Sequence, residues 1–93
     1  MEKITWSPFA ISDLKEIHDY IAKDSLRYAE GMVEGIIERI ENLNRFPLMG
    51  RMVPEFYDEM VRELIYKGYR ILYELKTEGK IEILSIIHGS RLL

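Results

Sequence analysis

The stretch VRELIYKGYRILYELKTEGKIEILSIIH, residues 61–88, contains three runs rich in β-branched and aromatic residues. In residues 61–66, 69–75 and 80–88, apolar and polar side chains alternate at the period of a β-strand, so we predict a strand for each run. Lys67-Gly68 and Thr77-Glu78-Gly79 separate the runs, and short segments containing glycine favour tight hairpin turns. This stretch therefore predicts a three-stranded antiparallel meander.

Two amphipathic helices are predicted upstream of the meander. Ser7-Pro8 is typical of a helix start, because serine caps free backbone N–H groups and proline at the first position has no N–H to leave unpaired. Asp24-Ser25 interrupts the apolar pattern and should cap a second helix. The two apolar stripes, spaced by three or four residues, are Ala10, Leu14, Ile17 and Ile21, then Ala29, Val33, Ile36, Ile40 and Leu43. So short a break predicts an antiparallel helix hairpin.

A short strand and a long connection complete the predicted fold. Ile4 and Trp6 lie at period two within residues 3–7, which favours a strand. Residues 46–60 contain two prolines and a glycine without periodicity, so we expect a loop, and ordered loops of this length are often functional. The prediction is an α+β fold of two layers, in the order strand, helix hairpin and three-stranded antiparallel meander. Residues 1–93 should form a single domain.

Composition limits the classes of function. The chain has 93 residues, of which 47% are hydrophobic and 31% charged, as in a small folded domain. It has no apolar run near 18 residues, so no membrane association is expected, and it has no cysteine, which excludes disulfides and fits a reducing cytoplasm. The net charge of −3 argues against broad phosphate binding. Known nucleotide-binding, hydrolase and metalloprotease motifs do not occur, so neither a cofactor nor a metal is expected.

Side-chain alternation determines which residues of the meander share a face. The more apolar sides of its last two strands should face the helices: Tyr69, Ile71, Tyr73 and Leu75, then Ile81, Ile83, Ser85 and Ile87. The opposite, open face would then carry Arg70 and His88 together, with Arg70 across from Ile86 and Glu74 across from Glu82. Polar residues on an open sheet face are usually only solvated. The residues alone therefore leave open whether this face binds anything.

Four segments together resemble the RelE/ParE superfamily of toxins from bacterial and archaeal toxin–antitoxin operons. They are WSPFAISDLKEIHDYIAKDSLRYA (residues 6–29), NLNRFPLMGRMVPE (42–55), RELIYKGYRILYEL (62–75) and IEILSIIHGSRLL (81–93). The resemblance implies a cytoplasmic toxin without a cofactor, which a cognate antitoxin holds inactive. It is also compatible with a heterotetramer or a larger complex of the two proteins.

The resemblance implies two alternative targets. ParE-like members inhibit DNA gyrase, whereas RelE-like members cleave mRNA in the ribosomal A site without a metal. The helix-hairpin segment, the GR before VPE and the HGSRLL ending are closer to the ParE-like branch, and the acidic net charge suits a ribosome-bound nuclease poorly. We therefore expect a ParE-like growth inhibitor. An mRNA endonuclease acting on the ribosome is the main alternative, and a module that has lost its toxicity is the other.

Under the endonuclease alternative, the resemblance assigns three catalytic residues. Metal-free RNA cleavage needs a base for the 2′-OH, a cation for the phosphorane and an acid for the leaving oxygen. The matching positions in this chain are Glu55, Arg70 and His88. Arg62 and Arg91 are the candidates for binding the target.

Overall fold

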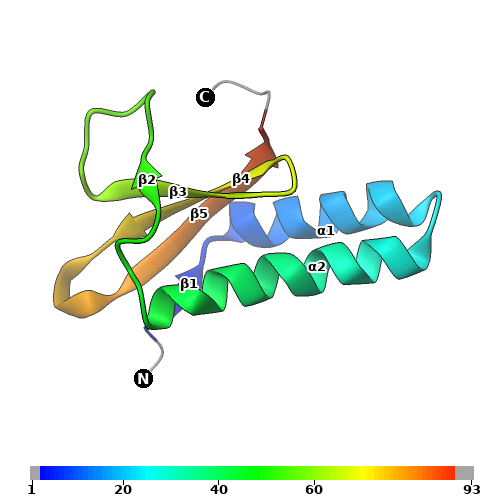
Figure 1. Cartoon of the computed structure of the whole chain (residues 1–93), viewed down its shortest axis with the longest axis horizontal. Coiled ribbons are helices and arrows are strands. Elements are labelled where there is room, and N and C mark those ends of the chain that lie inside the picture. Colours follow the sequence, from blue (N-terminus) through cyan, green and yellow to red (C-terminus); the bar gives the residue numbers. More distant parts are fainter. Residues whose placement is uncertain (1–2, 90–93) are drawn as a thin grey trace.

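Residues 3–89 are described in the computed structural model of this chain, in which two helices pack on one face of a sheet (Figure 1). The helices are α1 (Pro8–Ala22) and α2 (Leu26–Glu41), and the strands are β1 (Ile4–Trp6), β2 (Arg51–Met52), β3 (Val61–Tyr66), β4 (Tyr69–Leu75) and β5 (Ile81–His88). The sheet order is β1-β5-β4-β3-β2, with β1 parallel to β5 and the other neighbours antiparallel. The predicted α+β fold, with its helix hairpin and antiparallel meander, is confirmed.

The predicted helix starts are confirmed by their capping hydrogen bonds. Ser7 Oγ accepts a hydrogen bond from the N–H of Ala10 at 3.0 Å, and Ser25 Oγ accepts one from Tyr28 at 3.2 Å. Both apolar stripes face the sheet and form the main core with strand residues of one sheet face, among them Leu64, Ile71, Tyr73, Ile81, Ile83 and Ile86. No helix within residues 3–89 is long and apolar enough to cross a bilayer.

The sheet has one strand that was not predicted. Residues 51–52, inside the expected loop, pair with β3 through Arg51–Glu63 and Met52–Arg62. A strand of two residues is too short to show a period, so the sequence pattern had no means of revealing it. Its pairing fixes the start of the long connection against the edge of the meander.

Near the β4–β5 turn, the predicted pairing of the strands is confirmed. Glu74 lies opposite Glu82, and Leu75 lies opposite Ile81. Lys76 Nζ is 3.2 Å from a carboxylate oxygen of Glu82 and 3.8 Å from one of Glu74, which offsets the repulsion between these two carboxylates. This half of the sheet has the apolar face toward the helices, as expected.

Farther along, a β-bulge changes the register, and the predicted pairing of Arg70 is wrong. Tyr73 pairs with Ile83 but Leu72 pairs with Ser85, so β5 has one extra residue at this point. Beyond the bulge, Arg70 lies opposite Ile87 rather than Ile86. Each later residue of β5 therefore points to the face opposite the one that simple alternation predicts.

Two side chains satisfy the backbone of the bulge. The hydroxyl of Ser7 donates to the carbonyl oxygen of Leu84 at 2.7 Å, and Asp13 Oδ2 accepts from the N–H of Ile86 at 2.9 Å. The bulge allows Ile83 and Ile86, three positions apart, to enter the same core. Leu84, Ile86 and Ile87 are all apolar, so either face of this part of the strand could be buried, and alternation alone could not locate the extra residue.

Two glycines of α2 should respond oppositely to substitution by alanine. Glycine inside a helix costs about 1 kcal/mol relative to alanine. At Gly31 a Cβ would meet nothing within 4 Å, so Gly31→Ala should stabilise the fold by about 0.5–1 kcal/mol. At Gly35 a Cβ would lie 1.9 Å from Tyr66 Oη, so Gly35→Ala should destabilise it by about 1–3 kcal/mol. Denaturant unfolding of both variants checks this, and equal shifts would contradict it.

Candidate functional site

The sheet face away from the helices is covered in its centre by the connection between β2 and β3. Val53, on this connection, is buried in a second, smaller core with Val61 and Leu72, and Leu84 and Ile87 pack against it. Figure 1 shows the connection arching over the sheet on the side opposite the helices. The expectation that this face is open is therefore wrong at its centre. The connection buries apolar side chains of this face, among them Ile87, which the bulge turns to this side.

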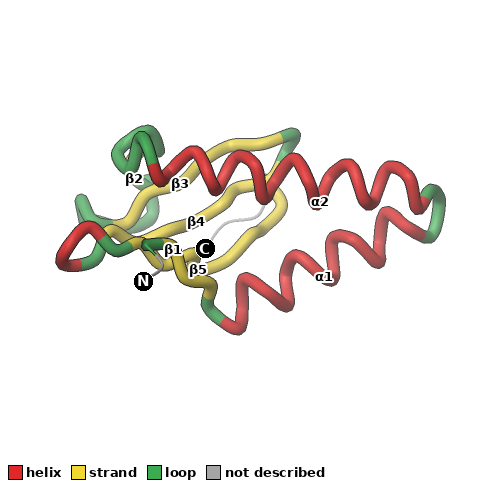
Figure 2. The backbone as a smooth tube through the Cα atoms, turned by 90° about the horizontal axis from the view of Figure 1, so that it is seen from below, coloured by secondary structure: helices red, strands yellow, loops and turns green. Residues whose placement is uncertain are grey.

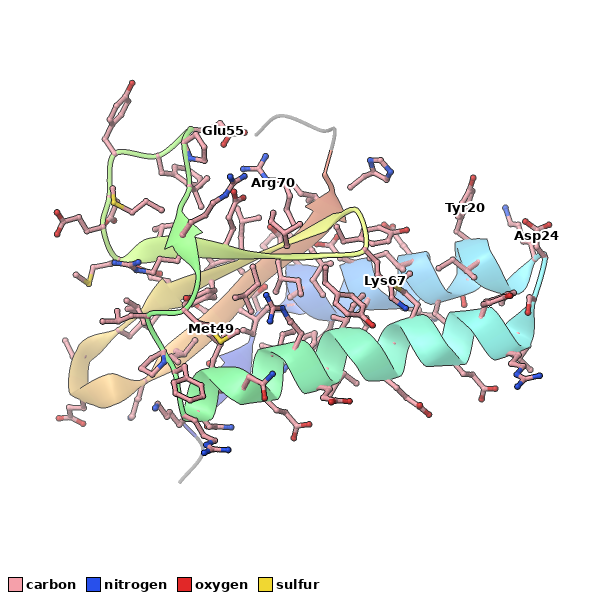
Figure 3. All side chains as sticks on the ribbon, viewed as in Figure 1. Tyr20, Asp24, Met49, Glu55, Lys67 and Arg70 are labelled. Carbon is pink, nitrogen blue, oxygen red and sulfur yellow. The ribbon has the colours of Figure 1, made fainter. Side chains whose placement is uncertain are left out.

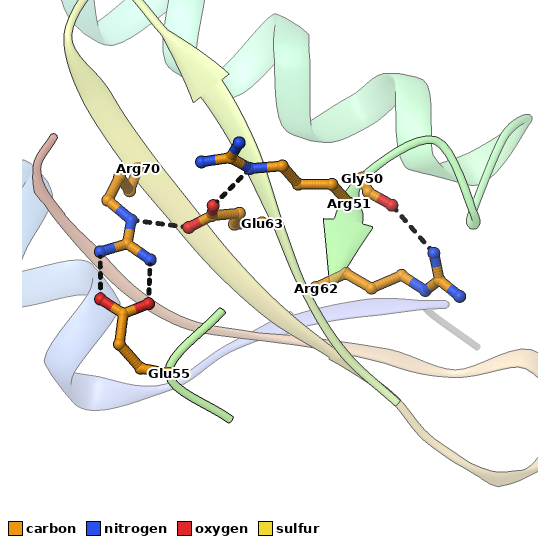
Figure 4. A network of polar contacts seen from close by, with 6 residues as sticks. All are labelled: Gly50, Arg51, Glu55, Arg62, Glu63 and Arg70. Carbon is orange, nitrogen blue, oxygen red and sulfur yellow. Dashed lines mark hydrogen bonds and ion pairs between the residues drawn. The ribbon is translucent and has the colours of Figure 1, made fainter. Parts of the chain in front are cut away.

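Arg70 lies beneath this connection and is held by two carboxylates (Figure 4). Its Nη1 and Nη2 each donate to a different oxygen of Glu55 at 2.8 Å, and its Nε donates to Glu63 Oε1 at 2.6 Å. The side chain of Arg70 is 6% exposed, that of Glu63 is fully buried and that of Glu55 is 22% exposed. A bidentate ion pair together with a third charge-assisted hydrogen bond stabilises a buried guanidinium group strongly.

The ion-pair network extends to a second arginine. Glu63 Oε2 accepts from Arg51 Nε at 2.6 Å, so the buried carboxylate of Glu63 lies between two guanidinium groups. Two cations and two anions alternate here, which makes the charge of the network zero. The hydrogen bond to Glu55 raises the pKa of Arg70 above its ordinary value; burial opposes this rise, and Glu63 adds to it. Arg70 is therefore charged at every pH at which the protein is studied.

The predicted catalytic residues do not come together. Glu55 and Arg70 are in direct contact, but His88 pairs with Tyr69 on the face that carries the helices. Its ring lies edge-on to that of Tyr69, with centroids 5.8 Å apart. The prediction that Arg70 and His88 share a face is wrong because the bulge reverses the end of β5.

The surroundings of His88 differ in chemistry from the Arg70 network. His88 is exposed and borders an open hollow of about 500 Å³ between α1 and the ends of β4 and β5. The other residues that line this hollow are acidic, aromatic or isoleucines: Asp13, Glu16, Ile17, Tyr20, Tyr69, Ile86 and Ile87. The imidazole is thus grouped with acidic and aromatic side chains and not with Arg70.

Of the two arginines expected to bind a target, Arg62 lies on the sheet face opposite this network. Arg62 pairs with Tyr73 on the helix face of β3, is partly buried, and donates from Nη1 to the carbonyl oxygen of Gly50 at 3.0 Å. Arg62 therefore supports the connection before β2. Arg91 lies outside residues 3–89, the part of the chain that the structure describes.

Glu63 and Arg51 are the residues of the network that were not predicted from the sequence, and Glu63 is the buried one. The turn at Lys67-Gly68 pairs Ile65 with Arg70, which places Glu63 two positions along the strand on the same face. Diagonal neighbours on one face are within reach of long side chains. The spacing of the hairpin therefore indicated that Glu63 lies near Arg70. A glutamate on a strand is usually solvated, however, and no neighbouring residue in the sequence indicated that the connection would bury Glu63.

Tyr73 anchors the segment before β2, and its contribution to stability can be tested. Its buried hydroxyl donates to the carbonyl oxygen of Pro47 at 2.9 Å and accepts from the N–H of Gly50 at 2.9 Å. Tyr73→Phe leaves both backbone groups without this partner, so we expect a loss of about 1–3 kcal/mol at neutral pH. Urea unfolding checks this, and a variant as stable as the wild type would contradict the anchoring role.

The same phenol gives an expected pH dependence. Burial raises the pKa of Tyr73 above 10.0; the hydrogen bond from Gly50 and the charge of Arg62 lower it to a smaller extent. Because the folded-state pKa is the higher one, the contribution of the phenol is complete below the unfolded pKa and is lost as the pH rises through the folded value. Above about pH 10, the stability of the wild type should fall more steeply than that of Tyr73→Phe. Parallel pH profiles would contradict this.

Within the described residues 3–89, no three histidine or acidic side chains are grouped so that they could hold a metal ion. The Arg70 network is a mostly buried set of ion pairs whose charges cancel. Such a set can hold a connection against a sheet. Its four side chains Arg51, Glu55, Glu63 and Arg70, counted by themselves, offer a nucleic-acid phosphate no excess positive charge.

Residues 4–93 match the family described as the ParE toxin of the type II toxin–antitoxin system parDE. Among curated proteins, Toxin RelE2 of Caulobacter vibrioides is 29% identical over 92 residues, a match that covers 99% of this chain and 100% of that protein. Both matches run over nearly the full sequence, so they include the helix hairpin, the connection and the meander.

Solved structures with a similar fold include toxin–antitoxin complexes. A chain of the chromosomal ParDE system from P. aeruginosa is 25% identical, with a TM-score of 0.75 and coverage of 95% of this chain and 96% of that one. A chain of the RelBE2 complex from Mycobacterium tuberculosis is 20% identical, with a TM-score of 0.66 and coverage of 92% and 95%. A chain of the YoeB–YefM complex from Staphylococcus aureus is 20% identical, with a TM-score of 0.59 and coverage of 95% and 97%. The last two likenesses concern the fold alone.

Proposed function

This chain belongs to the ParE toxin family of type II toxin–antitoxin systems, and from this premise we propose that it inhibits growth without cutting RNA, with DNA gyrase as its target. The match to the family covers residues 4–93. The choice between a ParE-like and a RelE-like activity rests on the chemistry of the side chains that a nuclease would use.

The observation that carries the proposal is the bidentate pair between Glu55 and Arg70. An endonuclease would need the carboxylate as a base and the guanidinium as a cation for the phosphorane. Here the two groups neutralise each other at 2.8 Å, and Glu63 binds the remaining edge of the guanidinium. An RNA phosphate would have to displace these charge-assisted hydrogen bonds from a side chain that is 6% exposed.

The position of His88 supports the same conclusion. A general acid must lie within hydrogen-bond reach of the atom that it protonates, while the cation binds the same phosphate. His88 and Arg70 belong to opposite faces of the sheet, because His88 pairs with Tyr69, and Tyr69 and Arg70 are consecutive residues of β4. One phosphate could not contact both without a change in the register of β5.

We propose a cognate antitoxin as the partner that keeps the toxin inactive, docking as an extended segment and a helix across the exposed apolar rim. β2 is an edge strand of only two residues, so its outer backbone groups can pair with an added strand. The exposed apolar side chains in and before it are Phe46, Leu48, Met49 and Met52.

Hydrogen exchange of the toxin with and without the antitoxin tests this docking. We expect slower exchange of backbone amides in residues 46–52 and along the helix hairpin, because an added strand and a docked helix exclude water from these segments. Unchanged exchange in both segments of a complex that demonstrably forms would rule out the docking. Residues 77–80, at the β4–β5 turn, provide an internal control that should not change.

The RelE-like alternative has one observation in its favour, the likeness to a protein named Toxin RelE2.

Inducing the toxin in cells separates the two activities. The proposal predicts filamentation and a DNA-damage response while mRNA stays intact. New mRNA ends within minutes of induction, absent from the variant His88→Ala, would favour the endonuclease. Unimpaired growth would contradict toxicity itself.

A further inference from the structure

The apex of the connection between β2 and β3, residues 56–59, carries an aromatic side chain that the fold does not use. Tyr57 has a relative exposure of 102%, so none of the described residues covers its ring. Phe56 and the nearby Met60 are also exposed. An exposed aromatic ring keeps apolar surface in contact with water, which is unfavourable. The stability of the monomer therefore gives no reason for tyrosine at this position.

The backbone on both sides of Tyr57 is fixed by a turn. Before it, the N–H of Phe56 donates to the carbonyl oxygen of Val53 at 3.1 Å, and Val53 is buried in the second core. After it, the N–H of Val61 donates to the carbonyl oxygen of Asp58 at 3.1 Å. The apex is therefore a short segment between two hydrogen-bonded turns, and each turn is joined to a buried residue.

The Arg70 network ties the first of these turns to the sheet. The bidentate ion pair of Glu55 with Arg70 lies only two residues before Tyr57. Figure 1 shows the connection on the side of the sheet away from the helices, and Figure 2 and Figure 3 show it far from the tip of the helix hairpin, near which Tyr20 lies. A side chain on a segment fixed in this way loses less conformational entropy on binding. Well-ordered tyrosines of this kind are typical anchors of protein–protein interfaces.

The exposed charges at the apex are negative. Residues 54–60 contain Glu55, Asp58 and Glu59 and no lysine or arginine. Glu55 pairs with Arg70 in a network whose four side chains have a net charge of zero. Asp58 and Glu59 are exposed, and neither forms an ion pair within the part of the chain that the structure describes. An exposed tyrosine beside two carboxylates of this kind is complementary to a basic protein surface.

We propose that Tyr57 is the anchor by which this toxin binds a basic surface of DNA gyrase. The proposal rests on the proposed function and names the contact on the toxin side. The ring of Tyr57 enters a pocket of the enzyme, and Asp58 and Glu59 pair with cationic side chains around that pocket. An enzyme that binds DNA has such basic surfaces, because it must neutralise phosphates. The ion pair between Glu55 and Arg70 then serves the activity by positioning the apex.

The affinity of purified full-length toxin for purified gyrase, together with inhibition of supercoiling, tests the proposal. Tyr57→Ala should weaken both about tenfold or more, because the anchoring ring is lost, whereas Tyr57→Phe should act like the wild type. Glu59→Lys should weaken binding more at low salt than at high salt, since salt screens charge pairs. The matched controls are Tyr20→Ala, an exposed tyrosine of α1, and Glu78→Lys, an exposed glutamate of the β4–β5 turn. Both controls should bind and inhibit gyrase normally.

The outcomes separate this inference from the proposed function. If the wild type inhibits gyrase and Tyr57→Ala inhibits equally well, the inference is overturned and gyrase remains the target. A loss as large in Tyr20→Ala as in Tyr57→Ala also overturns it, because the effect is then not specific to the apex. If Tyr57→Ala loses affinity for the antitoxin but not for gyrase, the apex serves the antitoxin, and the inference is wrong. If the wild type neither binds nor inhibits gyrase, both the proposed function and the inference fail.

Denaturant unfolding shows that a loss of inhibition does not reflect a loss of folding. Because Tyr57 is fully exposed, Tyr57→Ala should change the free energy of unfolding by less than about 0.5 kcal/mol. A variant that unfolds like the wild type and still fails to inhibit gyrase supports a contact with the target. A variant that is strongly destabilised would show that the ring serves the fold, which contradicts the inference.

Discussion

Arg70→Ala is expected to destabilise the protein by about 3–5 kcal/mol, because it leaves a buried carboxylate without its partner. Glu63 is fully buried and would keep only Arg51, while Glu55 would lose both of its hydrogen bonds to the guanidinium. A domain of this size has a total stability of about 5–15 kcal/mol, so the variant should be largely unfolded at temperatures that the wild type tolerates. Denaturant unfolding measures the loss.

Two further variants separate an effect of Arg70 on folding from an effect on the target. His88→Ala should change stability by less than about 0.5 kcal/mol, because His88 is exposed at the end of β5. Arg70→Ala combined with Glu63→Gln should recover part of the lost stability, because the neutral amide no longer leaves an unpaired charge in the core. If Arg70→Ala folds as stably as the wild type and yet loses all toxicity, then Arg70 acts on the target and the structural role of the network is wrong.

Deleting Ser85 should be tolerated, whereas deleting Glu82 should not. The bulge gives β5 one residue more than β4 needs, and Ser85 is part of it. Without Ser85 the ladder becomes regular, with Leu84 opposite Leu72, and Ile83 and Ile86 still face the helices. We expect a loss of about 1–2 kcal/mol, mainly from the altered contacts that Ser7 and Asp13 make with the bulged backbone.

Deletion of Glu82 also removes one residue of β5, but we expect it to disrupt the core. Removing Glu82 also makes the ladder regular, but it moves Ile83, which is fully buried, to the far face opposite Glu74. We expect a loss of about 2–5 kcal/mol, the usual cost of removing a large aliphatic side chain from a core. Thermal unfolding of the two deletion variants compares them directly. Equal stability, or a more stable Glu82 deletion, would show that the bulge does not set the register.

The helices and the meander were predictable because their signals are local. A serine before the first helical proline, a second serine after a break and a lysine-glycine turn each act within a few residues. These signals remain valid wherever the segment packs. Lys67 and Gly68 adopt φ values of 45° and 86°, as a tight hairpin turn requires, and the flanking strands begin and end where the alternation predicts.

The candidate site was less predictable because it depends on contacts between distant segments. The bulge in β5 requires Asp13 and Ser7, which are more than seventy residues away, and no pattern within β5 reveals them. The burial of Arg70 requires Glu55, which the long connection brings onto the sheet. The resemblance to toxins assigned Glu55 and Arg70 to one set of catalytic residues, and the structure brings these two side chains into contact. It gave no information on whether the pair faces a substrate or neutralises itself.

The most direct test of the account is DNA supercoiling by purified gyrase in the presence of purified toxin freed from its antitoxin. We expect wild-type toxin and His88→Ala to inhibit supercoiling to the same extent, and neither to cut mRNA on purified ribosomes. Full supercoiling in the presence of wild-type toxin, together with mRNA cleavage that His88→Ala abolishes, would contradict it.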